Sequence, residues 1–378
     1  MNDDEAVRLL HDAVAIPSVS GEEEELVRFL VRHARSMGLE SWRDEVGNFV
    51  AEAGVGSGSA PHVALVGHVD TVPGVIPVRI EGRRLFGRGS VDAKGALIAF
   101  LVAAARTVGD PAAPRITVVG CVEEEVASSR GARALLDRPA PDALVVGEPS
   151  GWDRVTLGYK GHLSASLTVD RPCGHGAHQE ESAAQRATTA WTRLEAAASR
   201  LNADRERLFD QLLLRLDGLE SGSDGLAEWA RIRVSLRLPP DLGPAEAARW
   251  LRATVLDGRL QTVPGIPAWR GPRTSSLARA FGRAISEEGT RPGYQVKTGT
   301  ADLNLLAPAW GCPAVAYGPG DASLDHTPRE ALDLDEFQRG LRVLGRVLGT
   351  AGAVAVGSGS RSEAVAAYDA RSPPPSQE

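Results

Sequence analysis

Hydrophobic and polar residues repeat with two different periods along the first part of the chain. Apolar positions three and four residues apart predict helices over residues 4–16, 20–38 and 95–109. Short runs rich in β-branched residues predict strands over residues 48–54, 62–69, 115–122 and 142–149. Helices that alternate with such strands are typical of an α/β sheet covered by helices on both faces. Polar groups that follow the strand cores should therefore meet at one edge of that sheet.

A different pattern begins near Tyr159. Alternating polarity predicts strands over residues 162–170 and 230–239, and helical spacing predicts helices over residues 182–202 and 244–256. We therefore expect an α/β domain with a mixed sheet, formed by residues 1–158 and 271–352, that is interrupted by a smaller α+β domain over residues 159–270. The polar, Pro- and Ser-rich residues 353–378 are expected to form a disordered tail.

Composition narrows the classes of function. The 378 residues include 42 Lys and Arg against 49 Asp and Glu, a formal charge of −7. This balance argues against a nucleic-acid-binding protein, and no apolar run approaches the roughly 18 residues of a membrane span. The start of the chain is acidic and amphipathic, unlike a secretory signal. Three cysteines without CxxC spacing indicate reduced thiols and a cytoplasmic protein.

The segment GHVDTVPG places a histidine and an aspartate at the end of an apolar strand. His68 and Asp70 are two residues apart, so they share one face of the strand. One interpretation is a metal ligand together with the carboxylate that orients it. The alternative is a histidine followed by a turn aspartate ahead of Pro73.

Further acids and a histidine stand in short motifs after other apolar segments. They are Asp92 in GRGSVDAKG, the triplet Glu123, Glu124 and Glu125 in CVEEEVASS, Glu148 in VVGEPS and His326 in DHTPRE. Carboxylates crowded at a partly dry sheet edge must become protonated, form pairs or bind a cation. Histidine combined with carboxylates suits zinc or a similar ion. The pattern alone does not choose among the three consecutive glutamates.

The glycines and the lysine of GRGSVDAKG do not make a phosphate-binding loop. That motif requires Gly-Lys followed by Ser or Thr, whereas Lys94 precedes Gly95 and an alanine follows. No nucleotide site is supported.

Five motifs in order resemble the dinuclear-zinc amidohydrolases and peptidases. This family includes carboxypeptidase G, aminoacylase, acetylornithine deacetylase and succinyl-diaminopimelate desuccinylase. Its pattern is HxD after a strand, then GRGxxDxKG, a paired acid, GEP and a late HTP, and all five occur here between Gly67 and Glu330. The resemblance implies a catalytic domain interrupted by a lid and dimerisation domain, which coincides with residues 159–270.

The resemblance also implies a role for each motif residue. His68 and Glu148 would bind one metal ion, Glu125 and His326 the other, and Asp92 would bridge the two. Asp70 would fix the tautomer of His68, and Glu124 would be the general base. Position 123 is often aspartate in the family, so Glu123 is a small departure. The peptide bond after Asp92 would be cis.

The activity implied by this family is hydrolysis of an amide with two Zn²⁺ ions, which Co²⁺ could replace. Zinc lowers the pKa of a water ligand and polarises a carbonyl group. Glu124 would take the proton of the attacking water and return it to the leaving amine. Two readings from other classes are a two-metal phosphoesterase and a metal-binding protein without catalysis. A retained base at Glu124 argues against the second of these.

Three segments point to a narrower group within the family. LGYKGHL, KTGTADLN and GDASLDHTPRE most resemble the lysine and ornithine hydrolases of the amino-group carrier pathway. Those enzymes release the amino acid from a small acidic carrier protein. The alternatives are free acyl-amino acids as substrates, for an N-acetyl-lysine or N-acetylornithine deacetylase or a succinyl-diaminopimelate desuccinylase.

The remaining expectations concern the substrate and a second subunit. The residues expected to contact the substrate are His178, Arg237, Thr300, Asp302 and Asn304. His178 matches the lid histidine that, in dimeric members of the family, reaches the partner's cleft and donates to the substrate carbonyl. A homodimer through residues 159–270 is therefore expected, with the edge of strand 162–170 as the pairing surface.

Overall fold

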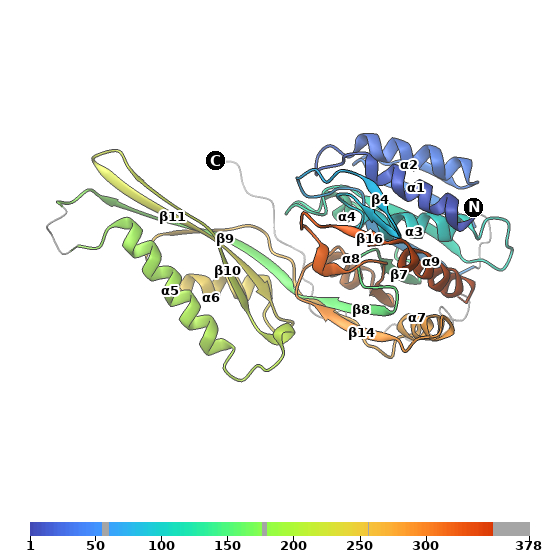
Figure 1. Cartoon of the computed structure of the whole chain (residues 1–378). Coiled ribbons are helices and arrows are strands. Elements are labelled where there is room, and N and C mark those ends of the chain that lie inside the picture. The colour runs from blue at the N-terminus through green and yellow to red at the C-terminus, as the bar shows by residue number, and fades with distance from the viewer. Residues whose placement is uncertain (55–59, 176–179, 256, 351–378) are drawn as a thin grey trace.

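Two bodies joined by a narrow neck make up the molecule (Figure 1). The computed structural model describes residues 1–54, 60–175, 180–255 and 257–350. The N-terminal and C-terminal parts of the described chain together form the larger body. The middle of the chain forms the smaller body, which is called the lid below. No helix among the described residues is both long enough and apolar enough to cross a membrane.

The larger body is built on a mixed nine-stranded sheet. The strands follow the order β1-β2-β6-β3-β7-β15-β8-β13, and β14 pairs with β8. Their bounds are β1 Glu40–Arg43, β2 Phe49–Ala53, β3 His62–His68, β6 Arg115–Cys121, β7 Ala143–Val146, β8 Arg154–Tyr159, β13 Trp269–Arg270, β14 Gly293–Lys297 and β15 Ala314–Ala316. The four strands predicted in the first part of the chain are therefore present as β2, β3, β6 and β7.

Side chains alternate along these strands between two hydrophobic cores. In β3, Val63 and Leu65 belong to one core, whereas Ala64 and Val66 belong to the other. The helices over the first core are α1 Asp3–Ala15, α2 Glu24–Ser36, α3 Lys94–Ala105, α7 Ser276–Glu287 and α9 Leu334–Gly349. Over the second core lie α4 Arg130–Arg133 and α8 Leu303–Trp310. The expected mixed sheet with helices on both faces is confirmed.

Helix α3 runs through the centre of the first core, which explains why its sequence is almost wholly apolar. Its one charged residue, Lys94, is buried, and its Nζ donates to the carbonyl oxygens of Ala13 at 3.2 Å and Ile16 at 2.7 Å. These carbonyls belong to the end of α1, where helical carbonyls lack the N–H groups of a following turn. Burial lowers the pKa of Lys94 to about 7. Lys94 therefore joins α1 to α3, in agreement with the rejection of a phosphate loop.

The lid is a four-stranded antiparallel sheet with two helices on one face. Its order is β10-β11-β9-β12, with bounds β9 Gly161–Pro172, β10 Leu213–Ser223, β11 Ala227–Leu238 and β12 Arg259–Thr262. Helices α5 Ala183–Leu201 and α6 Pro244–Thr254 share a third core with the inward side chains of β9 and β11. The remaining short elements are β4 Arg79–Glu81, β5 Arg84–Phe86, β16 Ala331–Asp333, η1 Leu208–Asp210 and η2 Ala322–Leu324.

Two expectations about the lid are corrected. Residues 162–170 are not an edge strand, because β12 pairs with β9 along Ala165–Thr168 and β11 covers its other side. The sequence prediction also lacks β10, whose alternation is weakened by glycines. Gly218 lies against the guanidinium of Arg233, and Gly222 lies against the ring of Trp229, so a larger side chain at either position would displace its neighbour. The free edges of the lid sheet are β10 and β12.

Candidate metal and active site

Three neighbouring strands bring the predicted site residues to one edge of the large sheet. Strands β6, β3 and β7 are adjacent and parallel, so their carboxyl ends coincide. His68 ends β3, the glutamate triplet follows β6, and Glu148 follows β7. These ends open on a cavity of about 710 Å³ whose lining includes Asp92, Glu124, Glu125, Glu148, His162, Arg237, Lys297, Thr300, Asp325 and His326.

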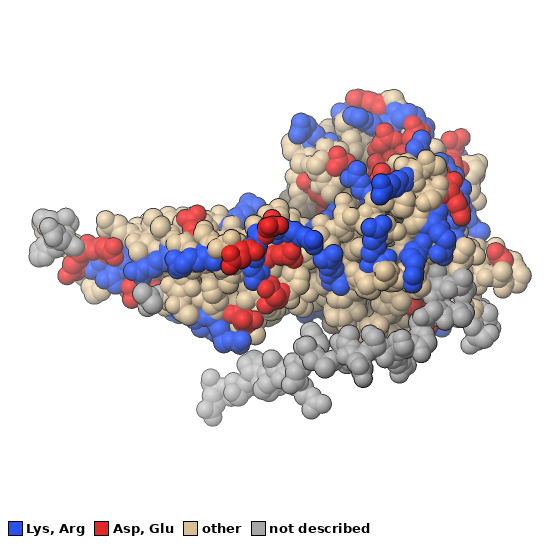
Figure 2. Space-filling view, turned by 90° about the horizontal axis from the view of Figure 1, so that it is seen from below, with Lys and Arg blue, Asp and Glu red and all other residues tan. Residues whose placement is uncertain are grey.

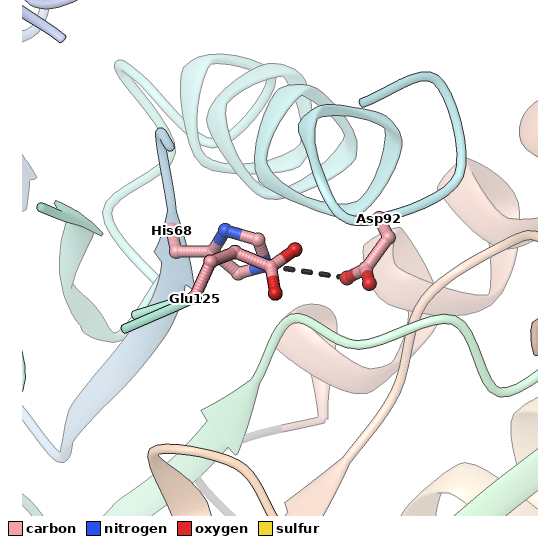
Figure 3. A group of neighbouring side chains, drawn as sticks. All are labelled: His68, Asp92 and Glu125. Carbon is pink, nitrogen blue, oxygen red and sulfur yellow. Dashed lines mark hydrogen bonds and ion pairs between the residues drawn. The ribbon is translucent and has the colours of Figure 1, made fainter. Parts of the chain in front are cut away.

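Asp92 lies between the two histidines and presents one oxygen to each of them. Its Oδ1 is 3.3 Å from Nε2 of His68, and its Oδ2 is 3.0 Å from Nε2 of His326. Glu125 Oε1 is also 3.0 Å from Nε2 of His326. Figure 3 shows His68 and Glu125 on one side and Asp92, from the segment just before α3, directed toward them.

These separations fit metal coordination. Two ligand atoms of a tetrahedral zinc site, each about 2.0–2.1 Å from the ion, lie about 3.3 Å apart. Ligand atoms of His68, Asp92 and Glu125 all lie within 4.8 Å of one another. Nδ1 of His68 is 2.9 Å from the backbone oxygen of Asp70, which can only accept. Nδ1 therefore carries the proton, and the lone pair of the neutral ring is on Nε2, which faces Asp92.

Asp70 connects the histidine motif to the glutamate motif. The carboxylate of Asp70 lies 3.5 Å from Nδ1 of His68, whereas the backbone oxygen of Asp70 is closer to that nitrogen. The same carboxylate accepts the backbone N–H of Glu124 through Oδ1 and that of Glu125 through Oδ2, both at 3.0 Å, and the hydroxyl of Ser20 at 2.7 Å. Asp70 thus holds the backbone of both glutamates beside His68, a role that the sequence pattern did not indicate.

The three consecutive glutamates have different surroundings. Glu123 forms an ion pair with Arg130 at 2.7 Å and accepts from the hydroxyl of Ser128 at 2.6 Å, so its side chain is directed away from the cavity lining. Its φ of 58° turns the chain at this point. Glu125 contacts His326, whereas Glu124 lines the cavity. Geometry thus removes Glu123 from the candidates that the sequence left open.

The carboxyl groups of this cavity are held in an unfavourable environment. Burial raises the pKa of Glu124 well above its ordinary value, and Glu148 raises it further, although His68 opposes the shift. Burial also raises the pKa of Glu148 to about 8, with a further contribution from Asp92. Buried acids of like charge favour a bound cation or a proton, so this donor set fits divalent metal ions.

Glu330 is a site residue that the sequence analysis missed, although it belongs to the quoted DHTPRE motif. It is fully buried and accepts the backbone N–H of Val91 at 3.0 Å and of Asp92 at 3.1 Å. Its other oxygen accepts from Nη1 of Arg88 at 2.8 Å. Glu330 therefore fixes the backbone that carries Asp92. The peptide bond between Asp92 and Ala93 is cis, as the resemblance implied.

The residues expected to contact substrate fall into three groups. Arg237 and Thr300 line the cavity, and Nη1 of Arg237 donates to Oγ1 of Thr300 at 3.0 Å. Asp302 and Asn304 are buried and are not part of the described cavity lining, so a contact with the substrate stays a prediction for both. His178 lies outside the described residues.

Asn304 instead fastens the neck between the two bodies. Its Nδ2 lies 3.2 Å from the carbonyl oxygens of Tyr159 and Lys160, where the chain enters the lid. The same nitrogen lies 2.9 Å from the carbonyl oxygen of Pro267, where the chain returns. The oxygen of the amide accepts the N–H of Ala301 at 3.2 Å. Both crossings of the neck are thereby held by one side chain of the larger body.

Replacing Asn304 with alanine should lower the free energy of unfolding by about 1–3 kcal/mol, because buried backbone groups lose their partner. Denaturant unfolding of the purified protein measures this change. Gln261→Ala is the matched control, since Gln261 is an exposed amide on β12, and it should change the free energy by less than about 0.5 kcal/mol. Equal effects of the two substitutions would contradict the structural role of Asn304.

Known proteins of related sequence include LysW-lysine and LysW-ornithine hydrolases. The chain is 43% identical over 346 residues to LysW-lysine hydrolase from Deinococcus radiodurans, covering 90% of this chain and 95% of that protein. It is 27% identical over 331 residues to LysW-lysine/LysW-ornithine hydrolase from Sulfurisphaera tokodaii, covering 87% of this chain and 90% of that protein.

A solved structure shows the same fold, and a family model matches most of the chain. The M20 family metallo-carboxypeptidase Sso-CP2 from Sulfolobus solfataricus superposes with a TM-score of 0.77 at 18% identity, covering 93% of this chain and 100% of that one. This likeness shows a shared fold. Residues 64–350 match the model of peptidase family M20/M25/M40. The chain therefore belongs to peptidase family M20/M25/M40.

Proposed function

We propose that this protein hydrolyses an amide with two metal ions and releases lysine or ornithine from a carrier-protein conjugate in amino-acid biosynthesis. The observation that carries the two-metal reaction is Asp92, which presents one carboxylate oxygen to His68 and the other to His326. The choice of substrate rests on the 43% identity to a protein named LysW-lysine hydrolase.

In this proposal each metal position has one histidine and one terminal carboxylate, with Asp92 shared. His68 and Glu148 would hold one ion, and Glu125 and His326 the other, with Zn²⁺ or Co²⁺ as the metal. Metal ions bound there would polarise the substrate carbonyl and lower the pKa of a water molecule. The distances from His326 to Asp92 and Glu125, both 3.0 Å, support this distribution of ligands.

Glu124 is the base of the proposed reaction. It lines the cavity, and Asp70 holds its backbone N–H beside His68. The raised pKa of Glu124 in this buried place suits a group that accepts a proton from water and passes it to the leaving amine. Arg237, fixed by its contact with Thr300, would bind a carboxylate of the substrate.

The carrier protein is the proposed partner. An acidic carrier requires a basic surface, and Figure 2 shows Lys and Arg side chains that form a band along the lid, interrupted by acidic residues. Strand β11 places Arg231, Arg233 and Arg237 on the face of the lid sheet opposite to its core. Free N-acetyl-lysine or N-acetylornithine is the alternative substrate class.

The oligomeric state and the cellular location belong to the same proposal. A homodimer would form through the lid, at the free edges β10 and β12, because an exposed strand edge favours pairing. His178 would act on the partner's substrate in that dimer. The free thiols of Cys121, Cys173 and Cys312 suit a cytoplasmic protein.

Removal of metal tests the proposed reaction. The purified protein should release free lysine from Nα-acyl-lysine or from the carrier conjugate, lose this activity after treatment with a chelator, and regain it with Zn²⁺ or Co²⁺. Ca²⁺ is the control, because it prefers six to eight oxygen ligands and should not restore the reaction. Full activity in protein from which all metal has been removed would contradict the two-metal reaction.

A further inference from the structure

One acidic residue of the cavity has no role in the proposed reaction. Five residues with carboxyl groups line the cavity: Asp92, Glu124, Glu125, Glu148 and Asp325. The first four are the proposed metal ligands and base. Asp325 stands directly after η2 and before His326, at the same cavity. It is therefore the acidic side chain of the described lining that remains available for the substrate.

The carboxylate of Asp325 is not paired within the described protein. Its Oδ1 is buried and has no hydrogen-bond partner, and no ion pair joins Asp325 to a described lysine, arginine or histidine. The lysine of the described lining is Lys297, whose Nζ donates to the carbonyl of Pro149 and lies 5.9 Å from the ring of Tyr159. A buried acceptor without a partner is unfavourable, and a cation satisfies it best.

The proposed substrate carries a cation of this kind. Lysine or ornithine that is bound through one nitrogen in an amide keeps a free carboxylate and a free ammonium group. Arg237, which lines the same cavity, matches the carboxylate. The ammonium group requires an acidic partner that is engaged neither by metal nor in proton transfer, and Asp325 meets this requirement.

We propose that Asp325 binds the free ammonium group of the lysyl or ornithyl half of the substrate and so sets the preference for basic amino acids. This inference rests on the proposed function and adds the residue that selects the leaving amino acid. Discrimination of this type is strong, because a substrate without the ammonium group leaves the buried carboxylate unpaired.

Two substrates that differ only in the ammonium group test the proposal. The zinc-loaded enzyme is assayed with Nα-acyl-lysine and with Nα-acyl-norleucine carrying the same acyl group. The wild type should prefer the lysine compound by roughly 10–100-fold in kcat/KM, the usual effect of a hydrogen bond to a charged group. Asp325→Asn should lose most of this preference through a lower kcat/KM for the lysine compound alone.

Two further variants separate charge from position. Asp325→Glu keeps the charge and extends the side chain by one methylene group, so its preference should move toward ornithine, whose side chain is one methylene shorter. Asp321→Asn is the control on the same loop: it removes one negative charge, and asparagine can retain the contact that Oδ1 of Asp321 makes with the N–H of Ser323. This control should keep the wild-type preference.

Metal content and product binding complete the test. Equal losses on both substrates in Asp325→Asn, or loss of metal from that variant, would overturn the role in selectivity and assign Asp325 to the metal site or the loop. A wild type without preference for lysine would overturn it as well. Calorimetric binding of free lysine and of free norleucine separates the two proposals. An enzyme that releases lysine neither from acyl-lysine nor from the carrier conjugate refutes the proposed function. Lysine binding that Asp325→Asn does not weaken refutes the role of Asp325.

Discussion

Replacement of Glu124 by glutamine is expected to lower kcat by roughly 10²–10⁴-fold, the usual contribution of general acid–base catalysis. Glutamine has nearly the same shape, but it cannot take a proton from water at neutral pH. The contact that positions this residue is made by its backbone N–H to Asp70, so the substitution leaves it in place. Metal content should stay near that of the wild type, and kcat rather than KM should carry the loss.

Glu125 and Glu123 provide the controls for this experiment. Glu125→Gln should reduce metal content. Both Glu125 Oε1 and a carboxylate oxygen of Asp92 lie next to Nε2 of His326, where the metal ion would bind. Glu123→Gln should have little effect on kcat, since Glu123 pairs with Arg130 outside the cavity lining. Elemental analysis measures the metal content of all three variants, and steady-state kinetics measures their kcat. Loss of metal in Glu124→Gln with full metal in Glu125→Gln would reverse the two assignments.

The strands that carry the site could be predicted because they are buried on both faces. In β3, every residue from Val63 to His68 is buried, so the apolar run and its polar end are visible in the sequence. The same holds for β7, whose four residues are all buried ahead of Glu148. Since parallel neighbours end at one edge, His68 and Glu148 were expected to meet, and they line the same site.

The sequence could not reveal which glutamate of the triplet enters the cavity. Consecutive strand residues alternate faces, but Glu123 has a φ of 58°, which ends that alternation. The direction of the next two side chains then depends on Asp70, which lies more than fifty positions earlier and holds both backbone N–H groups. A contact of this kind depends on the folded sheet and leaves no local pattern.

The neighbours of each strand in the lid sheet could not be predicted from the sequence either. The alternation of residues 162–170 correctly predicted a strand, but whether a strand lies at an edge depends on its neighbours. The short strand β12, Arg259–Thr262, covers β9 and has a weak pattern of its own. Asn304 was expected at the substrate, yet its amide lies at the neck, where segments distant in sequence meet.

Asp92→Asn should remove more metal and more activity than any substitution of a residue that only supports the site. The two oxygens of Asp92 face different histidines, at 3.3 Å and 3.0 Å, so one carboxylate serves both metal positions. Asparagine has a single oxygen and no charge, so it can serve at most one of them, and the metal ions lose a negatively charged ligand. We therefore expect metal content to fall below two ions per chain and kcat/KM to fall by more than roughly 100-fold.

Glu330→Gln is the control with a smaller expected effect, because Glu330 acts on Asp92 only through the backbone N–H at 3.1 Å. Substitution of a residue that only holds a metal ligand usually lowers metal affinity or activity by roughly 10–100-fold. If the Asp92→Asn variant binds two ions and is as active as the Glu330→Gln variant, then Asp92 does not bridge the two metal positions.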